Sequence, residues 1–323
     1  MSDRGVPDPI RDLAEARQRA RIERDWPEAD RLKEEIEQAG WRVVDRGVNF
    51  HLQPAEPPDV VVDGVVRHGT SGSVPSRLEE PPTAAATVVV VAAGPADASS
   101  RTLDGLRSRA PAGTQIVTVT FPGGGPSEQA VARAAPVDGA AGLGPEIVPM
   151  AGRVRPGTAL NAGIRRAAGE VVIIVSAGAV PTGDIVSPLI AALADPTVAV
   201  VGGWGSRTSD LRRFEPAPAG EVDVLDPACL AFRRADLVAR GPLEERFLTL
   251  RGLATWWSLV LRDEGEEQAP RRALALAELP LRRPESAEAD EVPEPTAPDR
   301  RAKRDAYRIL DRFGWRRDLA GAR

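Results

Sequence analysis

The sequence predicts an α/β protein with a mostly parallel sheet sandwiched by helices, preceded by a small N-terminal helical hairpin with β flaps. Three observations predict this fold. Nearly continuous apolar runs recur through the middle of the chain, as is typical of strands that are buried on both faces. Helix-length segments separate those runs, which favours parallel crossovers. The N-terminal residues instead show apolar positions at helical spacing, followed by two short hairpin patterns.

Residues 8–54 predict two helices and a hairpin. The break between the helices lies at Asp25-Trp26-Pro27-Glu28, where Asp25 can cap the second helix and Pro27 suits its first turn. Gly40 is expected to end the second helix, and Asp45-Arg46-Gly47 is expected to form the hairpin turn. The segment is therefore expected to fold as a small helical hairpin with a β flap.

Residues 55–83 predict a second hairpin and a linker. Asp63-Gly64 stands between two valine runs and is a strong signal for a two-residue turn. The stretch 69–83, GTSGSVPSRLEEPPT, is rich in residues that break regular structure. We therefore expect the boundary between two domains in this stretch.

Residues 84–284 show a regular alternation of strands and helices. We expect strands at 87–92, 115–119, 146–150, 171–175, 198–203 and 228–234, and helices near 98–109, 127–134, 158–168 and 252–264. Ligands of such sheets bind beyond the carboxyl ends of the strands. At those ends the chain has Ala93-Gly94, the glycine-rich segment 120–125 and Ser176-Ala177-Gly178, and none of them supplies a carboxylate.

The composition excludes several kinds of site. The single cysteine, Cys229, excludes an internal disulfide and a thiolate zinc cluster, and His51 and His68 are the only histidines. No run reaches the roughly 18 apolar residues of a membrane-spanning helix, and the charged N-terminus differs from a signal peptide. The cytoplasm is therefore the expected location. The formal net charge of −5 argues against a nucleic-acid binder that is basic throughout.

Charge is segregated at the C-terminal end, over residues 285–323. Residues 285–299 carry acidic charges alone, whereas arginine and lysine dominate from Arg300 onward. We interpret this pattern as a solvated acidic linker followed by a basic surface helix. A tail that binds nucleic acid is the alternative interpretation.

Within residues 13–53, the phrase LAEARQRARIERDWPEADRLKEEIEQAGWRVVDRGVNFHL resembles the C-terminal helical appendage of cysteinyl-tRNA synthetases. The match is carried by Ala16, Arg17, Asp25, Trp26, Ala29, Asp30, Leu32 and Gly40. In that family the appendage assists tRNA binding, so the resemblance implies tRNA or another RNA as a partner. The sequence lacks the catalytic domain and zinc ligands of the synthetases. Because acidic residues are as plentiful as arginine here, a packing or protein-contact module is the alternative.

Residues 84–284 resemble family 2 glycosyltransferases through three phrases in the same order. The phrases are PGTALNAGIRRAAGEVVIIV, VLDPACLAFRRADLVARGPLEERFL and ATWWSLVLRDEG. The first keeps Asn161, Gly163 and Gly169 of the family pattern, and the third keeps Trp257. The resemblance implies the GT-A fold of nucleotide-diphospho-sugar transferases, with one half for the nucleotide sugar and one for the acceptor.

The polar positions of that family are changed in this chain. The resemblance places the D-x-D pair, which holds a divalent cation, on Ser176 and Gly178, and hard cations require oxygen ligands of the kind that carboxylates supply. The other changed positions are the catalytic base and its neighbours, at Leu253, Ala254 and Trp256; the aspartate that reads uracil, at Thr120 or Phe121; and a late histidine, near 281–283. We therefore predict a fold kept without its chemistry.

The prediction is a glycosyltransferase-like protein with no metal cofactor and no catalytic residues, which acts as a binding or scaffold protein. Its degenerate nucleotide-sugar cleft is expected to include Asn161, Arg155, Ser176 and Gly178, and its partner to be a nucleotide sugar or a protein. One alternative is an active, metal-independent sugar transferase in which Arg153 or Arg155 grips the diphosphate. A second alternative is a tRNA- or RNA-associated protein that uses the N-terminal module.

Several side chains have two possible roles. Asp184 is expected to cap a helix, whereas Asp223 and Asp226 either face the cleft or, for Asp226-Pro227, form a turn. Cys229 is expected to be a buried apolar residue. Trp256 and Trp257 are expected in the core, with filling of the acceptor entrance or stacking on a sugar as alternatives.

Overall fold

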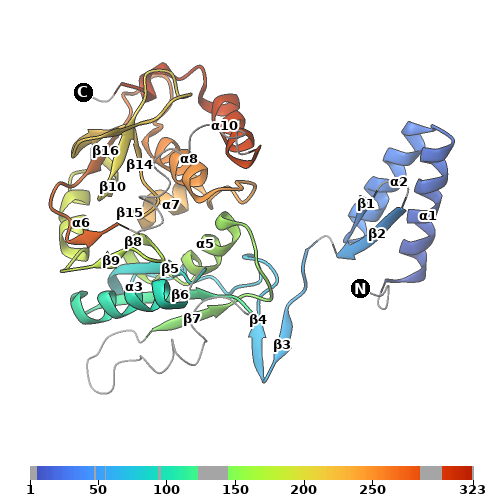
Figure 1. The fold of residues 1–323 in the computed structure, drawn as a ribbon, viewed down its shortest axis with the longest axis horizontal. Coiled ribbons are helices and arrows are strands. Elements are labelled where there is room, and N and C mark those ends of the chain that lie inside the picture. Colours follow the sequence, from blue (N-terminus) through green and yellow to red (C-terminus); the bar gives the residue numbers. More distant parts are fainter. Residues whose placement is uncertain are drawn as a thin grey trace. The chain divides into compact units, whose positions relative to one another are not determined.

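The computed structural model describes residues 6–46, 49–54, 56–93, 96–122, 145–283 and 300–321. The chain divides into two compact units, Met1–Thr70 and Ser71–Arg323. Figure 1 shows the helices and strands of each unit. In the described parts of the chain, no helix combines the length and the apolar character that crossing a membrane requires.

The first unit begins with two packed helices, α1 (Asp8–Ile22) and α2 (Trp26–Gln38). Ile36 is fully buried where α2 meets α1. The carboxylate of Asp25 accepts a hydrogen bond from the Glu28 amide at 3.2 Å and so caps α2. The predicted break and cap are therefore confirmed.

An antiparallel hairpin follows, made of β1 (Trp41–Arg46) and β2 (Asn49–Pro54). The predicted hairpin is confirmed, but strand pairing reaches Arg46, so Asp45 and Arg46 lie in β1 and not in the predicted turn. Asp45 lies within β1, and its carboxylate forms ion pairs with Arg17 at 3.0 Å and Arg21 at 2.6 Å. Asp45 thus fastens the hairpin to α1, a long-range contact that turn statistics do not detect.

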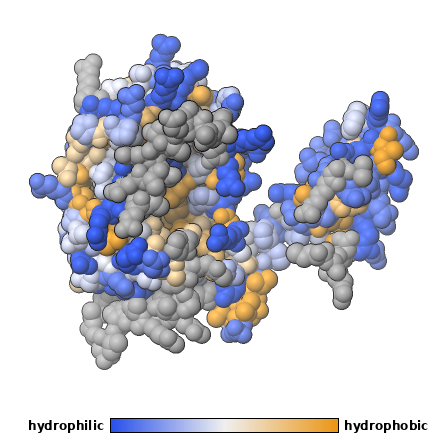
Figure 2. Space-filling model, in the orientation of Figure 1, coloured by the Kyte–Doolittle hydropathy of each residue, from blue (hydrophilic) through white to orange (hydrophobic). Residues whose placement is uncertain are grey.

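A second hairpin is formed by β3 (Val60–Val62) and β4 (Val65–Arg67). Asp63 and Gly64 between them have positive φ angles of 52° and 76°, the backbone of a two-residue hairpin turn. The predicted hairpin is confirmed. Its valines are between 39% and 70% exposed and form an apolar patch that is visible in Figure 2.

The second unit is built on an eight-stranded sheet, one half of which is parallel (Figure 1). The strands of this half lie in the order β8 (Gly169–Ser176), β5 (Ala84–Val91), β6 (Thr114–Thr120) and β7 (Glu146–Pro149). The central residues of β5, β6 and β8 are all buried, because helices cover both faces of the sheet. The predicted mostly parallel, helix-covered sheet is confirmed.

The other half of the sheet mixes directions. Its strands, in order from β8, are β15 (Cys229–Arg233), β10 (Val198–Gly202), β16 (Arg272–Ala275) and β13 (Gly220–Val222). β15 is antiparallel to both of its neighbours. Small two- and three-stranded sheets are added by β9 (Val180–Pro181), β11 (Gly205–Arg207), β12 (Glu215–Ala217), β14 (Val224–Leu225) and β17 (Leu281–Arg282).

Helices cover both faces of this sheet. One face packs against α5 (Pro156–Ile164), α7 (Arg234–Arg240) and α8 (Leu250–Arg262). The other face packs against α3 (Ala96–Arg109) and α6 (Val186–Leu193).

The C-terminal segment packs on α8. It consists of α10 (Arg300–Phe313) and a 3-10 turn, Arg317–Leu319. Ile309 and Phe313 of α10 are buried in the same core as α8, whereas most of its basic side chains are exposed.

Several predicted boundaries differ from the structure by a few residues, and the largest shift is at the end of a helix. The helix predicted near 158–168 is α5, which begins two residues earlier at Pro156 and ends at Ile164. The predicted helix ends early because the chain turns into β8, which begins at Gly169. The Gly169 amide donates to Thr87 Oγ1 on β5 at 2.8 Å. The helix predicted at 127–134 and the acidic linker predicted at 285–299 lie outside the described residues.

The stretch 69–83, predicted as a linker, divides after Thr70. From Ser71 onward it is packed on the second unit, where Val74 is 1% exposed and Leu78 contacts the core. The Ser71 hydroxyl donates a hydrogen bond to Glu245 at 2.5 Å. The prolines and glycines thus shape an ordered covering segment, because two apolar side chains among them anchor it.

Candidate functional site

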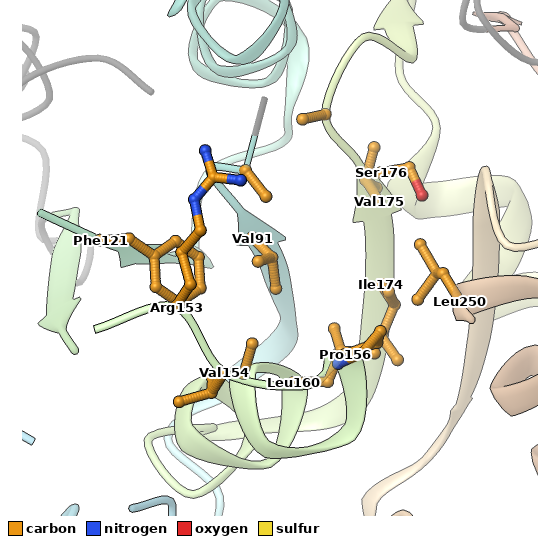
Figure 3. Close-up of a pocket in the computed structure, with 13 residues that line it drawn as sticks. Val91, Phe121, Arg153, Val154, Pro156, Leu160, Ile174, Val175, Ser176 and Leu250 are labelled. Atoms are coloured by element: carbon orange, nitrogen blue, oxygen red, sulfur yellow. The ribbon is translucent and has the colours of Figure 1, made fainter. Parts of the chain in front are cut away.

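A cavity of about 330 Å³ lies at the carboxyl ends of β5, β6 and β8, where parallel sheets bind their ligands. Val91 and Ser176 end their strands, and Phe121 directly follows β6. Figure 3 shows α5 along one side of the cavity, with Val154 and Leu160 next to it. The cavity therefore lies where the sequence predicted the ligand site.

The lining of the cavity is almost wholly apolar. Among the described residues, it comprises Val91, Ala93, Phe121, Arg153, Val154, Pro156, Ala159, Leu160, Ile174, Val175, Ser176, Ala177 and Leu250. Only Arg153 and Ser176 among them have polar side chains. Figure 3 places Arg153 and Phe121 on one side of the cavity and Ser176 and Leu250 on the other.

Ser176 is half-buried, and its polar groups bond to the segment that leads into β15. Its hydroxyl donates to the carbonyl oxygen of Pro227 at 2.7 Å. Its amide donates to the carbonyl oxygen of Ala228 at 3.0 Å. The hydroxyl proton is therefore used in holding two strands together.

Gly178 lies outside the lining of the cavity. Its amide donates to Thr102 Oγ1 on α3 at 2.9 Å, and its φ of +94° belongs to the left-handed region. A residue with a side chain would be strained at this φ. The turn after β8 is thus held by α3.

Asn161 is buried in α5, and its side chain is fully engaged by the segment before α8. Its Nδ2 donates to the Leu243 carbonyl at 2.8 Å and to Glu245 Oε1 at 2.9 Å, and its Oδ1 accepts from the Leu243 amide at 3.0 Å. Asn161 lies outside the lining of the cavity. Its amide joins the two halves of the domain.

Two arginines precede α5. Arg153 lines the cavity and is exposed, and it makes no hydrogen bond or ion pair with the described residues. Arg155 is also exposed and stands just before α5, outside the lining. Of the predicted cleft residues Asn161, Arg155, Ser176 and Gly178, the structure thus brings only Ser176 to the cavity; their binding of a nucleotide sugar stays a prediction.

The acidic residues that were candidate substitutes are bound elsewhere. Asp184 accepts hydrogen bonds from the Val186 and Ser187 amides at 2.8 and 3.1 Å, so its predicted capping role is confirmed. Burial acts to raise the pKa of Asp184, but the hydrogen bonds from Ser187 and Val186 outweigh it and keep this pKa below its usual value. Asp184 does not line the cavity.

Asp223 and Asp226 are both buried and both lie outside the lining. Asp223 Oδ2 accepts from the Thr208 amide at 2.8 Å. Asp226 accepts from the Ala228 amide at 2.9 Å and from Arg283 at 2.5 Å. Of their two predicted roles, the turn at Asp226 is the one observed.

A divalent cation does not fit the described residues of this site. The two D-x-D positions offer a hydroxyl that already donates and a glycine. Among the described residues, no group of three or more histidine, cysteine, aspartate or glutamate side chains could hold a metal ion. Hard cations need several oxygen ligands, and the lining offers only one side-chain oxygen.

Cys229 and the two tryptophans belong to the core, as predicted. Cys229 is fully buried, and burial, together with the nearby charge of Asp226, raises the pKa of its thiol to about 12. Such a thiol is inert as a nucleophile near neutral pH. Trp257 packs edge-on against Phe232, and Trp256 is also buried. Neither tryptophan lines the cavity.

Two contacts at or near the candidate site were not predicted from the sequence. Leu250, the first residue of α8, lines the cavity, although it lies far along the chain from the strands that form the rest. Arg283, near the position expected for a histidine, pairs with Asp226 and lies 5.6 Å from the Trp204 ring. Neither contact leaves a local sequence signal, because the partners are at least fifty residues apart.

Comparison with known proteins gives one family match. Residues 128–239 match the model of glycosyl transferase family 2. A search of curated proteins found no match.

Solved structures supply the remaining comparisons. PcManGT, a mannosyltransferase from Pyrobaculum calidifontis in complex with GDP-Man and Mn²⁺, is 19% identical over 76% of this chain and 75% of its own, with a TM-score of 0.46. GalNAc-T7, with UDP, GalNAc and Mn²⁺, is 13% identical over 70% of this chain and 48% of its own, with a TM-score of 0.51. TarS 1–349 from S. aureus is 16% identical over 59% and 58%, with a TM-score of 0.42.

The comparison with GalNAc-T7 agrees with the observed architecture. The chain contains a glycosyltransferase family 2-like domain, and GalNAc-T7 shares its α/β fold. The chain spans about half the length of the GalNAc-T7 chain and somewhat more of TarS 1–349. At these identities the likeness extends to the fold alone.

Proposed function

We propose that this protein is a non-catalytic binding or scaffold protein built on a glycosyltransferase family 2-like domain. One observation carries the proposal: the cavity at the carboxyl ends of β5, β6 and β8 has no carboxylate among its described lining residues. A cytoplasmic location, expected from the sequence, is part of the proposal.

The chemistry of sugar transfer explains why this observation matters. Departure of a nucleoside diphosphate requires positive charge on its phosphates, which a cation held by carboxylates supplies in many such sites. Deprotonation of an acceptor hydroxyl requires a base within hydrogen-bond reach. The positions that resemble the family's base, Leu253 and Ala254, are apolar and buried in α8. Both requirements thus lack a residue at the expected place.

Calorimetry and a turnover assay test the proposal. The full chain is titrated with UDP and GDP sugars, with and without Mn²⁺, and release of UDP or GDP is followed in the presence of candidate acceptors and of water. We expect no release of nucleotide and no Mn²⁺-dependent binding. Saturable binding accompanied by release of UDP or GDP, either with or without Mn²⁺, would overturn the proposal.

A metal-independent sugar transferase is the second candidate. Arg153 at the cavity favours it, because its guanidinium suits a phosphate and has no partner among the described residues. Turnover without Mn²⁺ that is lost in Arg153→Ala would support this candidate. Turnover that survives the substitution would remove Arg153 from any such role.

An RNA-associated protein is the third candidate, through the cysteinyl-tRNA synthetase-like module of the first unit. Trp26 is 56% exposed and borders a hollow of about 390 Å³ together with Arg17 and Arg21. Unstacked RNA bases bind to exposed aromatic rings. Both arginines are, however, paired with Asp45, which reduces the positive charge available to a phosphate.

Affinity for tRNA measured against salt concentration tests the third candidate. An RNA-binding module gives an affinity that falls steeply as salt rises. Trp26→Ala is expected to weaken binding through lost stacking, whereas substitution of the exposed Glu34 on the same helix serves as the matched control. No binding at low salt removes this candidate.

A further inference from the structure

The cavity of the second unit separates an apolar body from one positive charge. Eleven of its thirteen described lining residues have apolar side chains, of which Phe121, Leu160, Ile174 and Leu250 are the largest. Arg153 is the one charged residue among those thirteen. The volume of about 330 Å³ lies at the lower end of the range for small-molecule sites, about 300–1,000 Å³.

A polar ligand is poorly matched to this lining. Sugar hydroxyls or a base that enter the cavity would lose hydrogen bonds to water, and among the described lining residues only Ser176 and Arg153 have polar side chains. The Ser176 hydroxyl already donates its proton to Pro227. An apolar body loses nothing on entry and gains from leaving water.

The charge of Arg153 specifies the other end of the ligand. Its guanidinium makes no hydrogen bond or ion pair with the described residues, so none of these competes with an incoming anion. Arg153 is exposed, which places it at the rim of the cavity. Guanidinium groups bind carboxylates and phosphates through paired hydrogen bonds.

We propose that this cavity binds an amphipathic anion, with its apolar chain in the cavity and its carboxylate or phosphate on Arg153. This inference rests on the proposed non-catalytic function, because the ligand occupies the strand-end site that a nucleotide sugar would use in a sugar transferase. A cavity of about 150 Å³ holds one benzene, so this cavity accommodates roughly a dozen carbon atoms.

A series of straight-chain alkyl anions tests the chain-length dependence. The full protein is titrated calorimetrically with carboxylates from hexanoate to tetradecanoate and with the matching alkyl phosphates, below the concentrations at which they form micelles. The Kd is expected to fall about fourfold for each added methylene until the cavity is full, and then to level off. The two series distinguish a carboxylate from a phosphate head.

Three variants locate the binding. Arg153→Ala is expected to raise the Kd for decanoate about tenfold or more, while leaving the Kd for decanol unchanged. Ala93→Trp, at an exposed position of the lining, is expected to block both ligands without disturbing the core. Arg109→Ala, at an exposed position at the end of α3, is the matched control and leaves both Kd values unchanged.

The outcomes separate this inference from the proposed function. A Kd that does not depend on chain length, or that both Arg153→Ala and Ala93→Trp leave unchanged, overturns the inference. If no alkyl anion binds and no nucleotide sugar turns over, the inference fails and the proposed function stands. If alkyl anions bind and nucleotide-sugar turnover is found as well, the proposed function fails and the cavity remains a site for amphipathic anions.

Discussion

Two regions of the second unit differ in their charged groups and in the partners of those groups. One is the strand-end cavity, and the other is a buried polar network beneath the C-terminal segment. The cavity has a large apolar lining and one arginine without a described partner. The network, in contrast, buries Asp223, Arg262, Asp305 and Arg316, and each of them has hydrogen-bond partners.

Arg262 illustrates the network. Its Nη1 donates to the carbonyl oxygens of Asp223 at 2.7 Å and Leu319 at 2.8 Å, and its Nε donates to that of Arg271 at 3.0 Å. The Asp223 carboxylate lies 3.7 Å away. One side chain of α8 thus holds the 3-10 turn, β16 and the segment before β14.

The buried network shows that this domain can bury carboxylates where they hold chain segments together. Their absence from the cavity is therefore not a general shortage of buried acids. Among the described residues, buried charged groups join chain segments, whereas the lining of the cavity is mostly apolar.

Arg262→Met is expected to have the largest effect. The substitution keeps an unbranched apolar stem but leaves Asp223 buried without its cation and several carbonyl groups without a donor. The free energy of unfolding is expected to fall by about 3–5 kcal/mol. Urea unfolding followed by circular dichroism measures it. Arg251→Met, at an exposed position of the same helix, is the control, and a loss below about 1 kcal/mol for Arg262→Met would contradict the structural role of the network.

Asp305→Asn tests the attachment of α10. Asp305 is 1% exposed, and its Oδ2 accepts from the Thr249 amide and hydroxyl, both at 2.8 Å. An amide side chain keeps the shape but loses the negative charge and one acceptor, so unfolding is expected to become easier by about 1.5–3 kcal/mol. Thermal unfolding measures the change. Asp311→Asn, at an exposed position of α10, should be nearly neutral, and equal effects of the two variants would show that burial of Asp305 does not matter.

Ser176→Asp returns a carboxylate to the cavity. The new side chain cannot donate to the Pro227 carbonyl, and two acceptors then face each other. We expect a loss of about 1–3 kcal/mol in the free energy of unfolding, against about 1 kcal/mol for the control Ser176→Ala. Chemical denaturation of both variants measures it. A Ser176→Asp protein as stable as the original would break the contrast, because the cavity would then accept charge as readily as the network does.

The ionisation of Cys229 gives the smallest expected effect. Burial raises the pKa of its thiol from 9.0 to about 12, so the unfolded chain releases this proton at lower pH than the folded chain. The contribution to stability is complete below pH 9 and is lost as the pH rises toward 12. Between pH 8 and 9.5 the free energy of unfolding should fall by about 0.8 kcal/mol. The difference between the original and Cys229→Ala isolates this effect, and parallel pH profiles would contradict the buried thiol.

Much of the fold could be predicted from local patterns. The strand runs, the Asp25 cap and the Asp63-Gly64 turn are confirmed, because each depends on neighbours in sequence. Asp45 and Arg46 lie outside the predicted turn because α1 holds Asp45 in a strand. The stretch 69–83 differed from a linker because Val74 finds a core that lies elsewhere in the chain.

The candidate site could be predicted only in outline. Parallel-strand topology located the site at the strand ends, and Ser176 lies there as predicted. Arg155, Asn161 and Gly178 lie near it in sequence, but their exposure or hydrogen bonds direct them elsewhere. Leu250, on α8, lines the cavity, and no local sequence pattern predicts that contact.

The amino-acid sequence was enough to predict the α/β fold class and the lack of carboxylates at the D-x-D positions. Apolar strand runs and residue identities can be read directly from it. The folded structure was needed to show that the described lining is mostly apolar, that Arg153 at its rim has no partner among the described residues, and that Asp223 and Asp226 are bound away from it. The physical reason is that hydrogen-bond partners and cavity walls come from segments distant in the chain. Their meeting depends on how the helices pack on the sheet.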